Sequence, residues 1–187
     1  MVKALRLCSA GRADGSWWAE RVSDQTPTFS WGHININVTD LDRSIAFYEM
    51  LGFEAYVPGI PYLGLTQTMG EVEPSGVTAL GLPTGAKGRA CIMQLGRGYP
   101  KIDLTELDSD AQAAPLCNSD TGIVRLCLAT GDLVADYERL SALGVAFLSP
   151  PQTDSRGLAQ IAVCSDPDGA LIELIQIDRA KWAALRE

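Results

Sequence analysis

The chain has 187 residues, of which 47% are hydrophobic, so it can bury a core as one domain or as two small modules. Its formal net charge is −8 and it contains no run of lysine or arginine, so we expect neither a nucleic-acid partner nor a membrane partner. No signal peptide and no apolar stretch of about 20 residues is evident, which predicts a cytoplasmic protein. The five cysteines lack C-x-x-C spacing, which argues against a disulfide framework and a thiolate zinc site.

Residues 1–30 show no regular pattern and are predicted to form an N-terminal arm. The first element is a strand over residues 33–38, because polar and apolar residues alternate strictly in HININV. A helix follows, with Thr39 or Asp40 as its cap, apolar residues at helical spacing, and Gly52 at its left-handed end. The exposed face of the strand is predicted to carry the only histidine of the chain, His33, with Asn35 and Asn37.

The next predicted strands are FEAYV, RACIMQLG and KIDLTEL, which end the first module. The first module carries about 22 residues more than the second, and we assign this insertion to the segment near 58–87. The segment is rich in glycine, proline and threonine and is predicted to contain a short helix near 76–82. We expect this insertion to border the ligand-binding face and to contribute to ligand selection, because loops on a rigid scaffold often carry specificity.

An internal repeat defines the second half of the chain. Residues 125–145 align without a gap on 33–53, at an offset of 92, and again predict a strand, an aspartate cap, a helix and a closing glycine. Further strands are predicted in VAFLS, LAQIAVCS and ALIELIQI, with the turn DPDG before the last. The predicted organisation is therefore two βαβββ modules at 31–106 and 121–178, a linker at 107–120, and a C-terminal tail at 179–187.

These paired modules, the opening GHININVTDLDRSIAFYEMLGF and the closing DPDGALIEL resemble the vicinal oxygen chelate superfamily. That superfamily includes glyoxalase I, methylmalonyl-CoA epimerase, extradiol dioxygenases, and fosfomycin and bleomycin resistance proteins. The resemblance covers about residues 31–178. It implies an α+β fold in which two tandem βαβββ modules form a cupped mixed β-sheet with helices outside, and a homodimer.

The resemblance also implies that metal ligands come from the first and last strand of each module. Those positions are His33, Asp103, Arg125 and Glu173, here called the quartet. Strand alternation independently places all four on the face away from the helices, because their neighbours along each strand are apolar. His33, Asp103 and Glu173 could bind Mn²⁺, Fe²⁺, Ni²⁺ or Zn²⁺, whereas the guanidinium of Arg125 stays protonated and cannot ligate a metal.

Three interpretations of the quartet stay open at this point. The first is a three-ligand metal site in which Arg125 binds an anionic substrate. The second is a metal-free cup in which Arg125 binds an anion or forms a salt bridge, and His33 acts as an acid or base. We expect Glu173 to be the partner of Arg125 in the ligand-free protein, because the two begin and end one module. The third is a solvated polar floor without chemistry. Three further residues share the phase of the quartet and are predicted to contact substrate: Asn35, Thr105 and Cys127.

By resemblance, we expect an enzyme of lyase or isomerase type that acts on a small, anionic carboxylate or carbonyl compound. A metal ion or Arg125 would stabilise an enolate or oxyanion while Glu173 or Asp103 moves a proton. A dioxygenase or a fosfomycin-modifying enzyme is disfavoured, because both use two histidines and this chain has one. The alternative is a non-catalytic small-molecule-binding protein of the bleomycin-resistance kind, without a metal.

Overall fold

The structure is a computed structural model that describes residues 29–109 and 114–185. Most of the predicted N-terminal arm, residues 1–28, lies outside the described residues. The chain divides into two units, residues 1–31 and 32–187, and every described helix and strand belongs to the second. None of the described helices is long and apolar enough to cross a membrane.

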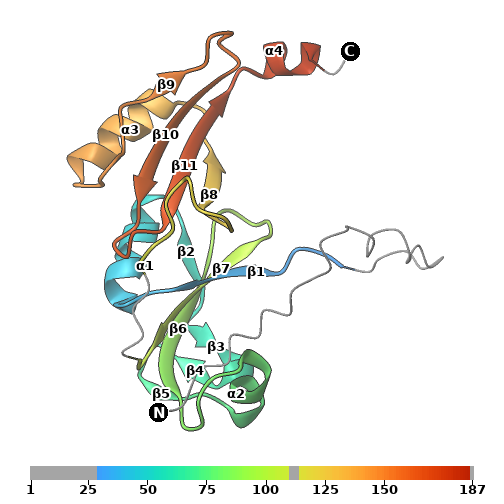
Figure 1. Ribbon diagram of the computed structural model, residues 1–187, viewed down its shortest axis with the longest axis vertical. Coiled ribbons are helices and arrows are strands. Elements are labelled where there is room, and N and C mark those ends of the chain that lie inside the picture. The colour runs from blue at the N-terminus through green and yellow to red at the C-terminus, as the bar shows by residue number, and fades with distance from the viewer. Residues whose placement is uncertain (1–28, 110–113, 186–187) are drawn as a thin grey trace, which may run out of the picture. The chain divides into compact units, whose positions relative to one another are not determined.

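The second unit contains both predicted modules (Figure 1). The first module consists of β1 (His33–Asn37), α1 (Leu41–Met50), β2 (Glu54–Val57), β6 (Lys87–Gln94) and β7 (Lys101–Leu107). The second consists of β8 (Arg125–Ala129), α3 (Leu133–Ala142), β9 (Gln152–Thr153), β10 (Ala159–Ser165) and β11 (Leu171–Ile177), and the C-terminal tail contains α4 (Arg179–Ala184). Between β2 and β6 lie β3 (Gly59–Ile60), the 3₁₀ turn η2 (Pro61–Leu63), β4 (Leu65–Thr66), β5 (Gly70–Glu71) and α2 (Pro74–Leu80).

The two modules have the same strand order. One sheet runs β1-β7-β6-β2, with β5 also on β6, and the other runs β8-β11-β10-β9. In each sheet the first strand pairs in parallel with the last, and the remaining pairs are antiparallel. The α+β class and the tandem βαβββ modules are thereby confirmed, with each module contributing its own hydrogen-bonded sheet.

The helices α1 and α3 have equivalent caps at both ends. The predicted caps Asp40 and Asp132 accept hydrogen bonds from the third residue beyond them, and each helix ends before a glycine with positive φ. The last strand of each module also contacts its own helix: Glu106 Oε2 accepts from the Leu41 amide at 2.7 Å, and Gln176 Oε1 from the Leu133 amide at 2.8 Å. The strand thus fixes where the helix starts in both modules.

The prediction of a regular strand at VAFLS, residues 145–149, is wrong. Only Phe147 forms an isolated bridge, to Cys164, and β9 occupies the edge of the sheet instead. The chain does run beside β10, because the Leu148 amide donates to the carbonyl of Val163. Two consecutive prolines, at positions 150 and 151, then follow, and proline has no N–H to continue a ladder.

One hydrophobic core joins the modules. It gathers buried residues of α1, α3 and the inner faces of both sheets, the largest being Tyr48, Leu41, Met93, Leu104, Leu133, Leu140 and Ile172. The turn DPDG of the second module closes over the start of α1: Asp168 accepts from the Thr39 amide and hydroxyl and pairs with Arg43 at 2.8 Å. The Tyr48 hydroxyl, at the other end of α1, donates to Asp166 at 3.2 Å.

Candidate functional site

The quartet lies on the sheet faces opposite the shared core. Exposure alternates along β1 and β8, and the apolar neighbours of Asp103 and Glu173 on their strands belong to that core. The predicted strand phase is therefore confirmed for all four residues. The face that carries them is called the polar face below.

The polar face of the first module brings His33 and Asp103 together with Tyr62 of the turn η2. His33 Nε2 lies 3.5 Å from Asp103 Oδ2, and the Tyr62 hydroxyl donates to the same Oδ2 at 3.3 Å and lies 3.5 Å from His33 Nε2. The imidazole and the phenol rings are stacked, with their centroids 6.3 Å apart. These three side chains form a triangle of long polar contacts, each above the usual hydrogen-bond length for such pairs.

Asp103 is the most deeply buried member of the quartet, at 1% exposure. Burial raises the pKa of this carboxyl above its ordinary value, while the charge of His33 and the hydrogen bond from Tyr62 act in the opposite direction. Its Oδ1 is buried and has no hydrogen-bond partner among the described residues. A buried acceptor without a partner costs free energy, so this oxygen is a candidate to bind a ligand or a proton.

The polar face of the second module brings Arg125 and Glu173 together. Arg125 Nε donates to Glu173 Oε2 at 2.6 Å, and its Nη1 donates to Asn118 Oδ1 at 2.9 Å. The predicted pairing of the guanidinium with this carboxylate is confirmed. Because the Arg125 side chain is 38% exposed, its remaining donors can reach an anion from solvent.

The other predicted substrate-binding residues also lie on the polar face, where Asn35 and Thr105 contact each other and Cys127 contacts Glu173. Thr105 donates to Asn35 Oδ1 at 2.9 Å, and Asn35 in turn donates to Asn37. Cys127 Sγ lies 3.5 Å from Glu173 Oε1, and burial, together with the charge of Glu173, raises the pKa of its thiol to about 11. The thiol therefore stays protonated at neutral pH and does not suit a nucleophile. That these three residues bind substrate stays a prediction.

The quartet forms two pairs, one in each module. Within residues 29–109 and 114–185, no three His, Cys, Asp or Glu side chains gather as they would around a metal ion. Arg125 stands where the resemblance implied a metal ligand, and it holds a Glu173 oxygen that a metal would need. The side chains brought together here therefore do not fit a metal centre with three or four protein ligands.

The insertion packs on the polar face of the first sheet. It forms a second apolar cluster with β6, in which Ile60, Leu65 and Val72 contact Ala90 and, at the margin, Ile92. Ala90 and Ile92 are cross-strand neighbours of Thr105 and Asp103, which explains why those two polar residues are buried.

The expected short helix is α2, at Pro74–Leu80. Tyr62 was not singled out by the sequence, because nothing in the pattern of the insertion indicates which side chain reaches the quartet.

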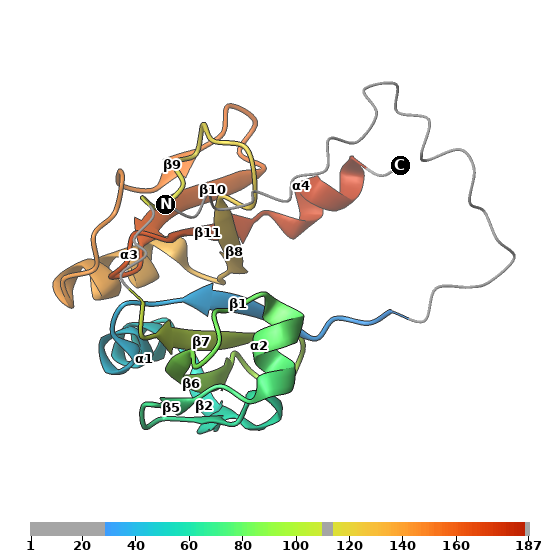
Figure 2. The same ribbon diagram turned by 60° about the horizontal axis from the view of Figure 1, so that its bottom comes forward.

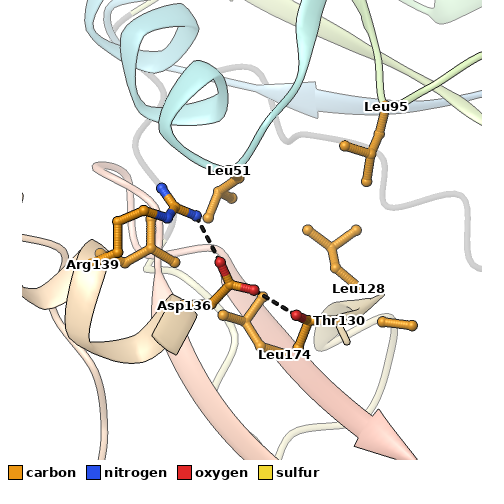
Figure 3. A pocket seen from close by; sticks show the side chains of 9 residues that line it. Leu51, Leu95, Leu128, Thr130, Asp136, Arg139 and Leu174 are labelled. Atoms are coloured by element: carbon orange, nitrogen blue, oxygen red, sulfur yellow. Dashed lines mark hydrogen bonds and ion pairs between the residues drawn. The ribbon is translucent and has the colours of Figure 1, made fainter. Parts of the chain in front are cut away.

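A separate pocket lies between the modules on the side of the helices (Figure 3). It measures about 140 Å³ and is lined mainly by leucines, with one ion pair at its wall between Asp136 and Arg139, at 3.0 Å. Thr130 donates to the same aspartate, and this hydrogen bond, with the Arg139 charge, lowers the pKa of the carboxyl. The Arg139 guanidinium also donates to the carbonyl of Met50 in α1. No quartet residue lines this pocket, which we interpret as part of the junction of the modules.

Comparisons with known proteins agree with this architecture. The family model of the Glyoxalase/Bleomycin resistance protein/Dioxygenase superfamily matches residues 30–174. A lactoylglutathione lyase from Pseudomonas aeruginosa is 30% identical over 161 residues, which cover 81% of this chain and 84% of that protein.

Two solved structures show the same fold at low sequence identity. A glyoxalase family protein from Bacillus cereus has a TM-score of 0.67 at 17% identity, covering 83% of this chain and 98% of its own. The trypanothione-dependent glyoxalase I of Leishmania major has a TM-score of 0.52 at 21% identity, covering 82% and 91%.

Proposed function

Because the chain belongs to the Glyoxalase/Bleomycin resistance protein/Dioxygenase superfamily, we propose that it is a glyoxalase-like enzyme of lyase or isomerase type. The observation that carries this proposal is the identity of 30% with a lactoylglutathione lyase over 84% of that protein's length. We propose as substrate class the adduct of a 2-oxoaldehyde with a thiol, which a proton transfer converts into a 2-hydroxyacyl thioester. A small anionic ligand, a homodimer and a cytoplasmic location belong to the same proposal.

In the proposed reaction the substrate lies on the polar face, in contact with both pairs. A carboxylate takes the proton from the hydroxyl-bearing carbon, and the electron pair left behind forms an enediolate. Returning the proton to the neighbouring carbon gives the thioester without any external oxidant or reductant. The guanidinium of Arg125 would stabilise the oxyanion, because it carries a positive charge and several N–H donors.

Asp103 is the stronger candidate for the base. Its pKa is raised by burial, which brings a carboxyl closer to the basicity that proton abstraction at neutral pH requires. One of its oxygens has no partner among the described residues, whereas Glu173 is held by Arg125 at 2.6 Å. In this scheme His33 orients the carboxylate of Asp103, and Glu173 orients the guanidinium.

The proposal is tested by mixing methylglyoxal, glutathione and the protein and following the formation of lactoylglutathione. The parent should form the thioester, and Asp103→Asn should lower kcat by about 100-fold or more, the usual contribution of a general base. Glu138→Gln, which changes an exposed carboxylate on α3, serves as the matched control and should keep the parent rate. Lack of thioester formation by the parent, or full activity of Asp103→Asn, would contradict the proposal.

One observation favours the second candidate, a non-catalytic small-molecule-binding protein. Glu173 already pairs with Arg125 and so partly neutralises the positive charge that a catalytic centre would offer to a substrate oxyanion. A binding protein needs such a site only to recognise an anion. The thioester assay, together with calorimetry, decides between the two functions. A binding protein would bind ligand in calorimetry but form no thioester.

A further inference from the structure

The hydroxyl of Tyr62 lies where a ligand oxygen could bind. It contacts Asp103 Oδ2 at 3.3 Å and His33 Nε2 at 3.5 Å, so one oxygen atom faces both a hydrogen-bond acceptor and an imidazole nitrogen. Both contacts exceed the usual 2.7–3.0 Å or so for such pairs, so the phenol is held loosely. A ligand hydroxyl that approached more closely would form the same two bonds with better geometry.

The buried carboxylate supplies the second observation. Asp103 is 1% exposed, and its Oδ1 has no partner among the described residues, although a buried carboxylate oxygen normally accepts at least one hydrogen bond. Tyr62 therefore covers a carboxylate that it only partly satisfies. The side chains of His33, Tyr62 and Asp103 together make a site with one position for a hydroxyl and one unused acceptor.

The position of Tyr62 on the insertion allows its ring to move while the backbone stays fixed. The backbone around it is anchored, because the neighbouring Ile60 is fully buried in the second apolar cluster. The Tyr62 side chain itself is 58% exposed, and Gly64, in the left-handed conformation, ends the turn η2. Rotation of the phenol toward solvent would uncover Asp103 without unpacking the insertion.

We propose that His33 and Asp103 form a binding subsite for the hydroxyl group of a 2-hydroxycarboxylate or 2-hydroxyacyl ligand, and that Tyr62 occupies this subsite in the free protein. The ligand hydroxyl donates to Asp103, accepts from His33 and replaces the phenol. Binding of such a ligand therefore competes with an internal hydroxyl. The inference rests on the proposed function for the class of ligand, but its test requires binding only.

The test compares two ligands that differ by one hydroxyl group, lactate and propionate, in calorimetric titrations of the parent, Tyr62→Phe and Asp103→Asn. Tyr62→Phe keeps the ring and removes the competing hydroxyl, so it should bind lactate about 2- to 10-fold more tightly, as expected for one net hydrogen bond. Its affinity for propionate should not change. Asp103→Asn should lose the preference for lactate.

Tyr99→Phe is the matched control, because Tyr99 is another exposed tyrosine of the same module and contacts neither His33 nor Asp103 in any described interaction. It should bind both ligands like the parent. Unchanged or weaker lactate binding by Tyr62→Phe, an equal gain for propionate, or no lactate binding by any variant would overturn the proposal.

A spectroscopic measurement on the parent reports the exchange directly. With fluorotyrosine incorporated, the Tyr62 signal, assigned by its loss in Tyr62→Phe, should shift on adding lactate and stay in place with propionate. The imidazole signals should also respond to lactate, and they are unambiguous because His33 is the only histidine of the chain. If the protein shows these responses but forms no lactoylglutathione, the proposed function is refuted and this subsite stands. If the protein forms lactoylglutathione without these responses, the subsite is refuted and the proposed function stands.

Discussion

At the scale of single residues, Arg125 is the member of the quartet that cannot donate a lone pair to a metal. Its guanidinium makes a short hydrogen bond to Glu173 and a second to Asn118, so it is positioned by two partners and still 38% exposed. Sequence alternation predicted its strand face, and the positions of Arg125 and Glu173 at the start and end of one module predicted its carboxylate partner. Tyr62 could not be predicted in the same way, because it reaches the quartet through the fold of the insertion.

Replacing Arg125 separates anion binding from metal binding. Arg125→Lys keeps the charge but loses the planar fork, so binding of lactate should weaken by about 1–3 kcal/mol in calorimetry. Arg125→His removes the guanidinium and adds a nitrogen ligand, so it should bind more Mn²⁺, Ni²⁺ or Zn²⁺ than the parent in elemental analysis after dialysis. Parent-like metal content in Arg125→His together with parent-like lactate binding in Arg125→Lys would show that this description of the site is wrong.

At the scale of elements, the insertion is a packed part of the first module. Its cluster buries Ile60 and Leu65 almost completely against β6. A glycine-rich loop could have been a mobile cover, but its apolar residues turn it into a wall of the polar face. Apolar residues inside an irregular segment carry no periodicity, so the sequence indicated the helix α2 without revealing what the insertion covers.

Ile60→Ala tests whether the insertion is anchored as described. Ile60 is fully buried, so its truncation should lower the free energy of unfolding by about 2–5 kcal/mol in urea denaturation. Leu80→Ala, at a half-exposed position of α2 in the same insertion, should change it by less than about 0.5 kcal/mol. Equal, small effects of both substitutions would mean that the insertion contributes little to the stability of the module.

At the scale of the whole molecule, the second module is held to the first by a core and by the turn DPDG. The repeat in the sequence predicted two equivalent modules because its signals are local: alternation, caps and closing glycines. It gave no indication of how the modules contact each other, since Asp168 and Thr39 are 129 residues apart and their pairing depends on the fold. The strand VAFLS was mispredicted for a related reason, since apolar content alone does not secure a place in a sheet.

Asp168→Ala tests the contact between the modules. The substitution removes acceptors for the Thr39 amide and hydroxyl and for Arg43, and should lower the free energy of unfolding at pH 7 by about 1–3 kcal/mol. Burial by itself would raise the pKa of Asp168, but the hydrogen bonds from Thr39 and the Arg43 charge lower it overall. The stabilisation is therefore present above the ordinary aspartate pKa of about 3.9 and is lost as the pH falls through the lower pKa of the folded state.

Urea denaturation of the parent and of Asp168→Ala at pH 7 and at successively lower pH measures this difference. The two curves should converge in acid. Glu138→Ala, which removes an exposed carboxylate from α3, should differ little from the parent throughout. A gap between the parent and Asp168→Ala that stayed constant down to pH 3 would show that the contact does not depend on the aspartate charge.

The insertion makes the two halves of a repeated fold unequal. The half with Arg125 stays open to solvent, while the half with Asp103 is closed by an internal wall and a tyrosine. For the ligand proposed above, we therefore expect the anionic group to reach Arg125 directly, and the hydroxyl to reach Asp103 only after the Tyr62 side chain has moved. The repeat thus gives two sheets of the same strand order, and the insertion covers the polar face of only one of them.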